Sequence, residues 1–191
     1  MALYSDFGQF NERFGDDPEA LATLIVHEYG RYYQEDSRGS LAQITQSATN
    51  LTVVEKLAEA LGRLASVLRQ LLTEKDFDVE NALSYAKRKV MRFKDKDCVD
   101  LYDLLKILRD EYSSESTELA TVLYEVIDLM SFEIEPKLVV ANVTSGLRFS
   151  RVKGLSIYSP FKGYSKFYDR SDFASCGWGE LIRFHNSVDG E

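Results

Sequence analysis

The feature that most constrains the fold of this chain is its scarcity of proline. Only three prolines occur among 191 residues, at Pro18, Pro136 and Pro160. A proline inside a helix removes a hydrogen bond and clashes with the preceding turn, so the long interval between the first two is free to form long helices. The sequence therefore predicts that most of the first 135 residues are helical.

The strongest periodic pattern lies within this interval, between about residues 50 and 73. Apolar residues recur there at spacings of three and four, which is typical of a helix with one buried face. They are Val54, Leu57, Leu61, Leu64, Leu68 and Leu71. We expect one long helix that packs along this stripe.

Further helices are predicted on both sides of the stripe. The first starts near Pro18, because an acidic cap, a proline in the first turn and an early glutamate suit a helix start. Apolar periodicity predicts three more helices, at about residues 79 to 93, 99 to 112 and 116 to 131. A short last helix places Trp178, Leu181, Ile182 and His185 on one face.

The pattern changes after Pro136. Residues 137–143 and 154–158 are short, apolar and β-branched, which is typical of two strands with an irregular connection. An isolated pair of strands is marginal in water and leaves N–H and C=O groups open at its edges. We therefore expect these strands to pair with further strands that this chain does not supply in quantity. Residues 160–175 are rich in Tyr, Phe, Gly and Ser and are expected to form an ordered loop.

The expected fold is mostly α with a small β component (α+β). Residues 1–135 are predicted to form a helical layer, a bundle of about five helices. Residues 136–191 are predicted to add the strand pair, the aromatic loop and a C-terminal helix. The two parts are expected to form one continuous unit within a larger fold.

Charge and hydropathy exclude several classes of function. The formal net charge is −8, which disfavours a nucleic-acid partner because binding to DNA or RNA requires a basic face. No apolar run approaches the ~18 residues of a membrane span. The amino terminus also lacks the charged and then apolar layout of a signal peptide. We expect a cytoplasmic chain with no nucleic-acid partner and no membrane partner.

One segment departs from the acidic average. Residues 85–96 carry six cations and one anion. Because Val90 and Phe93 occur within it at helical spacing, the solvated outer face of a helix is the simpler interpretation. A site for phosphate or another acidic ligand remains the alternative.

Few residues could carry nucleophilic catalysis. The thiols are Cys98 and Cys176, and the imidazoles are His27 and His185. Cys98 precedes a predicted helix, whose dipole would lower the pKa of the thiol, but three nearby aspartates would raise it. His27 lies in an apolar helical run and is expected to be structural or exposed. We assign no catalytic residue, and a dyad of Cys176 and His185 remains a minor alternative.

The sequence also lacks the ligand patterns of common cofactors. Two cysteines are too few for a disulfide framework or a structural zinc cluster. No spaced zinc ligand set, EF-hand loop or glycine-rich phosphate loop occurs. We therefore assign no cofactor-binding and no metal-binding residue.

Three motifs occur in a fixed order in the second half of the chain. Residues 99–105 read Val-Asp-Leu-Tyr-Asp-Leu-Leu, residues 154–160 read Gly-Leu-Ser-Ile-Tyr-Ser-Pro, and Phe173 precedes Gly-Trp-Gly-Glu-Leu at 177–181. This order resembles the C-terminal half of the clostripain family of cysteine peptidases. That family has an Asp-Leu-Tyr-Asp helix start, a Gly-Leu-Ser-Ile-Tyr-Phe-Pro strand and a closing helix with Phe and Trp. Ser159 departs from the family's aromatic residue at that position.

The resemblance extends upstream and covers about residues 18 to 186. The helix that contains Ile25, Val26, Tyr29 and Tyr33 is similar to the segment that follows the catalytic core in such enzymes, as is the lead-in at residues 45–48. In clostripain-like peptidases the catalytic His and Cys end neighbouring strands of a caspase-like core, before the matched region. This chain has no such strand, so neither role is carried over to it.

The resemblance implies a structural, non-catalytic region of a peptidase that hydrolyses peptide bonds after Arg or Lys. Whether this chain is itself an enzyme is left open, and alone it is expected to be inactive. The implied partner is a catalytic peptidase core, separately encoded or missing, and self-association through an exposed strand edge is the other expectation. The alternative is an independent helical protein-interaction module with no peptidase activity.

Overall fold

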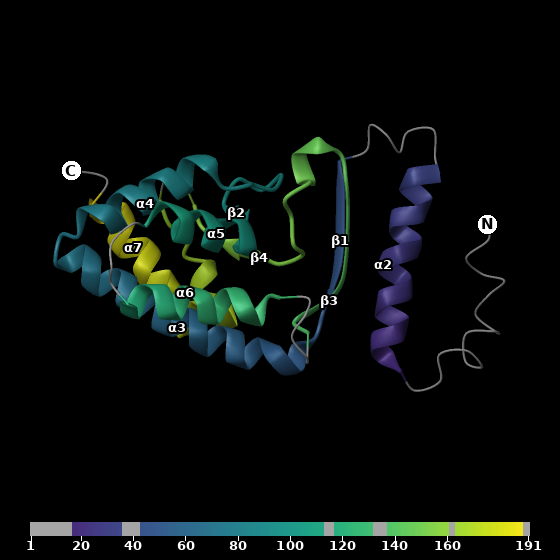
Figure 1. Ribbon diagram of the computed structural model, residues 1–191, viewed down its shortest axis with the longest axis horizontal. Coiled ribbons are helices and arrows are strands. Elements are labelled where there is room, and N and C mark those ends of the chain that lie inside the picture. Colours follow the sequence, from purple (N-terminus) through teal and green to yellow (C-terminus); the bar gives the residue numbers. More distant parts are fainter. Residues whose placement is uncertain (1–16, 36–42, 113–116, 132–136, 161–162, 189–191) are drawn as a thin grey trace.

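The computed structural model describes residues 17–35, 43–112, 117–131, 137–160 and 163–188. Within these ranges the chain is mostly helical, with six α-helices and two small antiparallel sheets (Figure 1). The predicted fold class, mostly α with a small β component, is confirmed.

The long helix α3, Leu51–Thr73, lies at the centre of the hydrophobic core. Asn50 caps its N-terminus, where the side-chain oxygen accepts a hydrogen bond from the Thr52 N–H. The predicted leucine stripe faces inward and packs mainly against two later helices, α6 and α7. The buried residues of α3 are Val53, Leu57, Ala60, Leu61, Leu64, Ala65, Val67 and Leu68. Burial of this face is the main apolar contribution to the fold.

Four further helices surround α3. They are α4 (Phe77–Lys89), α5 (Leu101–Glu111), α6 (Thr117–Leu129) and α7 (Trp178–Val188). α4 packs against α5, and α5 contacts α6. Three short 3-10 helices complete the connections, namely η1 (Leu147–Phe149), η2 (Tyr168–Arg170) and η3 (Asp172–Cys176).

Two predicted helix boundaries are wrong. The helix predicted to reach residue 93 ends at Lys89, because Val90 is extended (φ −61°, ψ 142°). The helix predicted from residue 99 starts at Leu101, because Asp100 caps it and residues 98–100 form a strand. Tertiary pairing thus overrides helical periodicity at both positions.

The two predicted strands do not pair with each other. β3 (Val139–Ser145) pairs with β1 (Ile44–Thr49), and β4 (Ser156–Tyr158) pairs with β2 (Cys98–Asp100), both antiparallel. The chain therefore supplies one partner for each strand, which corrects the expectation that both depend on strands from elsewhere. The partners escaped prediction because β1 is small and polar apart from Ile44, and β2 is three residues long. Each sheet has two strands within the described residues.

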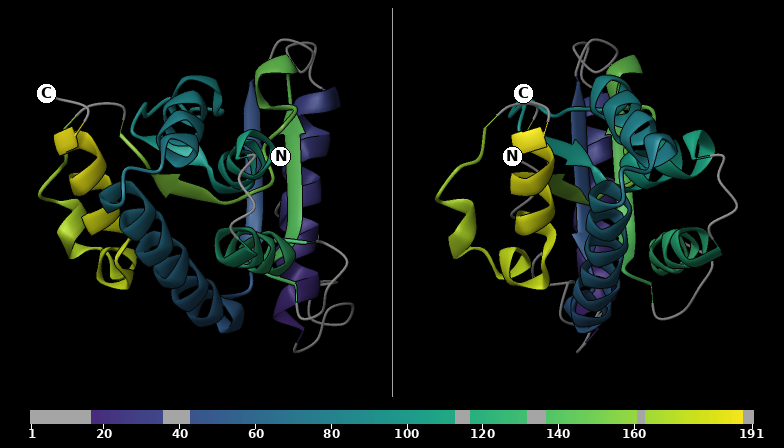
Figure 2. Two further views of the ribbon diagram at one scale, coloured as in Figure 1. Left: turned by 60° about the vertical axis from the view of Figure 1, so that its left-hand side comes forward. Right: turned by 90° about the vertical axis from the view of Figure 1, so that its left-hand side faces the viewer.

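Helix α2, Pro18–Glu35, covers one face of the β1–β3 sheet. Figures 1 and 2 place this sheet between α2 and the other helices. Val26 and Gly30 are buried against it. A Cβ atom on Gly30 would lie 2.5 Å from Cγ2 of Val143. The missing side chain lets the helix approach the sheet this closely.

We predict that Gly30→Ala costs less stability when the side chain at residue 143 is smaller. In the natural sequence it lowers the free energy of unfolding by about 1 kcal/mol, because the overlap with Val143 outweighs the higher helix propensity of alanine. In a Val143→Ala background the 2.5 Å overlap is absent and only Cβ of residue 143 remains, 3.3 Å from the added methyl, so Gly30→Ala lowers that free energy by clearly less. Urea unfolding of the four proteins measures both effects. Equal destabilisation in both backgrounds would contradict this account of the packing.

Candidate functional site

Cys98 lies in β2 rather than at a helix start, so the helix dipole does not act on it as predicted. Burial raises the pKa of the Cys98 thiol, and the charges of Asp95 and Asp97 raise it further. A thiol with a raised pKa is largely protonated at neutral pH and is a weak nucleophile.

Cys176 ends η3, immediately before α7. Its thiol donates a hydrogen bond to the Phe173 carbonyl, with an Sγ to O distance of 2.9 Å. This contact orients the thiol toward the backbone of its own turn.

The two histidines occupy different environments. His27 is exposed on α2, which agrees with the expectation that it is either structural or exposed. His185 is buried in α7, where its Nδ1 lies 2.7 Å from the Lys87 ammonium of α4. The same ammonium donates to Asn186 Oδ1 at 2.9 Å. Because an ammonium only donates hydrogen bonds, His185 Nδ1 acts as the acceptor, and the contact joins α4 to α7.

The structure does not bring Cys176 and His185 together. α7 begins at Trp178, so His185 lies roughly 10 Å along the helix axis from its start, at ~1.5 Å per residue. Their nearest polar partners also differ, a loop carbonyl for the thiol and Lys87 of α4 for the imidazole. Direct proton transfer needs contact near ~3 Å, so this pair does not form a catalytic dyad.

The most distinctive polar arrangement is a pair of buried carboxylates, Asp100 and Asp103. Asp100 accepts the Asp103 N–H on one oxygen and the Lys153 N–H on the other, both at 2.9 Å. Asp103 accepts the Met91 N–H at 2.7 Å and pairs with Arg151 at 3.3 Å. We call this arrangement the carboxylate clasp. It joins the start of α5 to the loop after α4 and to the segment before β4.

Burial has the largest effect on the pKa of Asp100. It raises the pKa of Asp100 from its ordinary 3.8 to about 6, although both backbone N–H donors oppose the shift. The neighbouring Asp103 carboxylate adds to the rise, and the Lys153 charge lowers it. A carboxylate with this pKa changes its protonation state between mildly acidic and neutral pH.

A small polar cavity lies beside the clasp. Its volume is about 280 Å³, it is open to the surface, and it is lined by β1, the loop after α4 and the segment that leads into β4. The lining residues are Thr45, Gln46, Ser47, Phe93, Val152, Gly154 and Ser156. Ser47 Oγ donates to the Gly154 carbonyl at 2.6 Å. Because no lining side chain titrates near neutral pH, the cavity can bind a polar group but offers no acid or base.

The aromatic segment before α7 is held by ring contacts and a shared carboxylate. The Tyr158 and Tyr168 rings stack with their centroids 4.4 Å apart. Asp169 accepts hydrogen bonds from the Tyr164 hydroxyl and from Arg183, both at 2.7 Å. Burial raises the pKa of Tyr164 to about 12. These contacts orient η2 and α7, and they place no nucleophile beside a base.

The basic segment predicted as the outer face of a helix is only partly helical. α4 ends at Lys89, and residues 91–97 form a loop. Arg92 donates to the carbonyls of Lys96 and Ser159, at 2.6 and 3.0 Å. Three of the six cations therefore lie in the last turn of α4 and three on the loop, which leaves the alternative of an acidic-ligand site open.

The sequence showed Asp100 and Asp103 as part of a family motif, and Asp100 also as one of three aspartates near Cys98, but it did not predict the clasp. A buried role could have been suspected from their position between apolar residues in Val-Asp-Leu-Tyr-Asp-Leu-Leu. Their partners, Arg151 and Lys153, lie about 50 residues away in the sequence, and no local pattern connects them.

Comparisons with protein-family models, with curated proteins and with solved structures found no match to this chain. In the part of the chain that the structure describes, no three His, Cys, Asp or Glu side chains gather as metal ligands do. No helix in the same ranges is both long and apolar enough to cross a membrane.

We predict that Asp100 makes stability depend on pH in a defined window. The folded protein retains the Asp100 proton up to about pH 6, whereas the unfolded chain loses it near 3.8. The folded state thus binds more protons between these values, so the free energy of unfolding falls as pH rises through this window, by about 2 kcal/mol.

Urea unfolding between pH 4 and 7 tests this prediction. Asp100→Asn should flatten the pH dependence, and Asp128→Asn, which changes an exposed carboxylate on α6, should leave it in place. An unchanged slope in Asp100→Asn would contradict the assignment.

Proposed function

We propose that this chain is the non-catalytic supporting region of a clostripain-like cysteine peptidase. In this role it completes a caspase-like core that carries the catalytic His and Cys and cleaves after Arg or Lys. The proposal rests on the ordered motifs of the sequence and on the shape of the β1–β3 sheet.

The observation that carries the proposal is that the β1–β3 sheet, which α2 covers on one face, has two strands within the described residues. α2 packs on one face of β1 and β3, and the other helices lie beyond the opposite face (Figure 2). Within the described residues no third strand joins either outer edge. Outer edges of this kind leave backbone N–H and C=O groups open to pairing with a strand from another chain.

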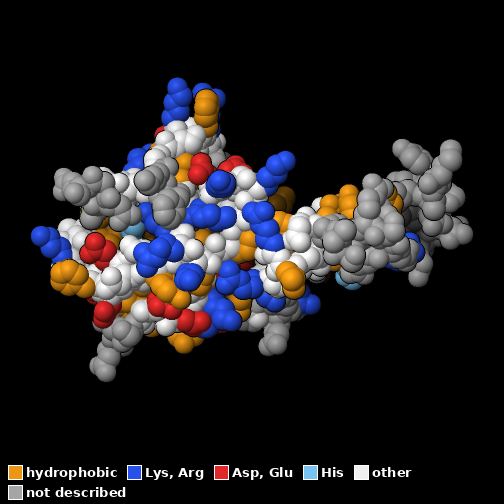
Figure 3. Space-filling model, turned by 90° about the horizontal axis from the view of Figure 1, so that it is seen from above, with side chains coloured by type: hydrophobic (Ala, Val, Ile, Leu, Met, Phe, Trp, Pro, Cys, Tyr) orange, Lys and Arg blue, Asp and Glu red, His pale blue; other side chains and the backbone are white. Residues whose placement is uncertain are grey.

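The exposed side of α2 supports the same interpretation. Ile25 and Tyr32 are 54% and 61% exposed, although both lie on a helix that covers a sheet. They are seven residues apart and therefore share one side of the helix, at about 100° from the buried Val26. Figure 3 shows hydrophobic side chains at the surface of this helix. A strand added to the sheet would give these side chains a surface to pack on.

The absence of a thiol and imidazole contact among the described cysteines and histidines supports a non-catalytic role. We predict that the purified chain does not cleave peptides with Arg or Lys before the scissile bond. Fluorogenic peptides of both kinds measure this. Cleavage that disappears in Cys98→Ala or Cys176→Ala would show that the proposal is wrong.

We predict that the isolated chain self-associates, because among the described residues no strand pairs with the open edge and Ile25 and Tyr32 of α2 stay exposed. Light scattering over a concentration series should show dimers or larger species. Ile25→Lys with Tyr32→Lys should return the protein to a monomer. The matched control, Tyr124→Lys with Phe167→Lys, changes side chains that are 53% and 62% exposed elsewhere and should not. A natural chain that remains monomeric at high concentration contradicts this prediction.

Proline variants of β1 distinguish strand pairing from simple helix docking. Successive residues of an edge strand direct their N–H groups alternately to the partner strand and to the open edge. Of Thr45→Pro and Gln46→Pro, one should therefore preserve the β1–β3 pairing and block the open edge. An unchanged circular dichroism spectrum identifies that variant. If it still self-associates, the alternative function, an independent helical interaction module, is favoured.

The partner itself can be sought in the neighbouring coding sequence. We expect a reading frame there that encodes the His and Cys core. Co-expression should then yield one complex, which the α2 double variant weakens and its matched control does not.

A further inference from the structure

We infer that one face of this chain is a docking surface for a carboxylate-rich polypeptide segment. The surface comprises the end of α4, the loop that follows it and residues 147–153. Figure 3 shows Lys and Arg side chains gathered over this face. Its cations are Arg88, Lys89, Arg92, Lys94, Lys96, Arg148, Arg151 and Lys153. We call this face the basic surface. Its proposed role in docking does not rest on the peptidase function proposed above.

The basic surface is rigid because two distant segments are joined beneath it. Met91, Phe149 and Val152 form a small hydrophobic cluster of their own, separate from the main core. The Phe93 and Phe149 rings stack over it with their centroids 6.0 Å apart. The carboxylate clasp holds the same two segments from the side of α5. A rigid backbone saves the cost of ordering the loop itself when a partner binds, although the exposed side chains still lose rotamer freedom.

The guanidinium groups of this surface are fixed by neutral acceptors. Arg148 donates to the carbonyls of Arg92 and Phe93, at 3.1 and 3.3 Å, and Arg151 donates to the Lys89 carbonyl at 3.0 Å. A carbonyl oxygen satisfies a hydrogen-bond donor but does not neutralise its charge. The orientation of Arg148 is therefore set while its charge remains available, whereas Arg151 also pairs with the Asp103 carboxylate.

The ion pairs elsewhere on the molecule make a clear contrast. Outside the basic surface, five arginines pair with a carboxylate, whereas Arg170 and the lysines Lys56, Lys75, Lys106 and Lys166 lie in no ion pair among the described residues; the five are Arg31, Arg63, Arg69, Arg109 and Arg183. Within the described part of the basic surface, Arg88, Lys89, Lys94, Lys96 and Arg148 lie in no such pair, and all five are exposed. Arg151 pairs with the buried Asp103, and the charges of Asp97 and Asp100 act on Arg92 and Lys153.

Charge asymmetry points to an acidic polypeptide rather than to nucleic acid. The surface has eight cations, and the nearby acidic groups are Asp95, Asp97, Asp100 and Asp103, of which the last two are buried. The rest of the chain holds 15 basic and 27 acidic residues. Duplex DNA carries a phosphate charge about every 1.7 Å and would extend over this acidic remainder. A short segment of Glu and Asp fits within the basic surface. At about 0.1 M salt the Debye length is about 10 Å, so repulsion from acidic residues beyond that distance is largely screened.

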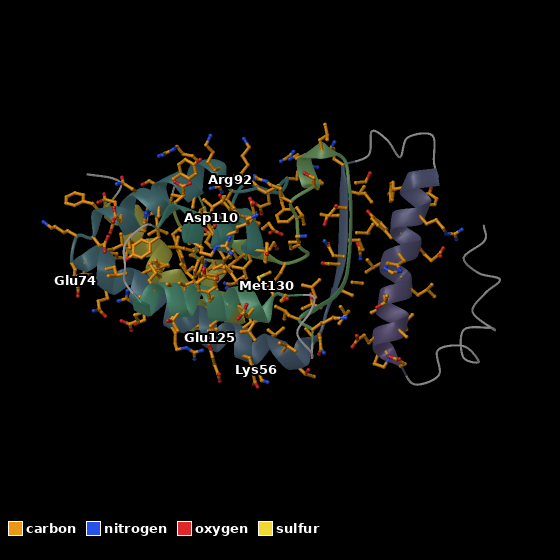
Figure 4. All side chains as sticks on the ribbon, in the orientation of Figure 1. Lys56, Glu74, Arg92, Asp110, Glu125 and Met130 are labelled. Carbon is orange, nitrogen blue, oxygen red and sulfur yellow. The ribbon has the colours of Figure 1, made fainter. Side chains whose placement is uncertain are left out.

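Fluorescence anisotropy on the full chain tests the inference. The probe is a short labelled peptide of alternating Glu and Ser, measured in about 0.1 M salt, where charge attraction remains effective. Lys89→Glu with Lys94→Glu should weaken binding about tenfold or more. The control, Lys56→Glu with Lys75→Glu, makes the same change in net charge away from the surface. Figure 4 shows Lys56 on the side of the molecule opposite Arg92. The control should leave the affinity within about twofold.

Each other outcome overturns the inference. If the peptide does not bind, or if both double variants weaken it equally, the surface has no specific role. If a single-stranded or duplex oligonucleotide of equal charge binds more tightly than the peptide, the partner class is wrong. A peptide in which Gln replaces Glu should not bind, and equal binding of that peptide would exclude carboxylate recognition.

Discussion

The buried carboxylate of Asp100 is the interaction on which the arrangement around the cavity depends. Its two oxygens accept backbone N–H groups from α5 and from the segment before β4, which are far apart in the sequence. Burial without these donors would leave a charge with no compensation, at a large energetic cost. The same two bonds therefore specify where α5 begins and where the chain enters β4. The raised pKa of Asp100 reflects how completely this carboxylate is removed from water.

The clasp also explains why the basic residues and the cavity lie side by side. Asp103 holds the loop after α4 through the Met91 N–H, and Arg151 reaches back to both Asp103 and the end of α4. The loop and residues 147–153 then enclose the small cluster around Phe149. A basic stretch and an irregular connection, each unremarkable in sequence, become one rigid surface through these contacts.

The β1–β3 sheet presents a different physical problem. α2 approaches it closely through Gly30, and the remaining helices lie on its other side. The sheet between them has two strands within the described residues, and Ile25 and Tyr32 of α2 remain exposed. An open sheet edge next to exposed apolar side chains is the kind of surface that a partner strand covers. The proposed supporting role and the expected self-association both follow from this one geometric mismatch.

The long helix was predictable because its apolar residues recur at spacings of three and four, which a strand cannot place on one face. In the structure α3 buries that face. The partner strands β1 and β2 were not predictable, since Ile-Thr-Gln-Ser-Ala-Thr shows no alternating apolar face and Cys-Val-Asp is only three residues long. The thiols and imidazoles were visible in the sequence, but their separation became clear only from the fold. Arg151 and Lys153 were likewise ordinary cations until the fold placed them beside Asp103 and Asp100.

The sequence by itself therefore determined the helical class and the central apolar stripe, because these depend on a periodicity that local geometry imposes. It also determined the acidic net charge and the few candidate thiols and imidazoles, because these are composition. Only the tertiary structure decided which strands pair, where α4 and α5 end and begin, and which carboxylates are buried. Those outcomes depend on contacts between residues about 50 to 100 positions apart. Such contacts form when the apolar faces pack, and no local pattern records them.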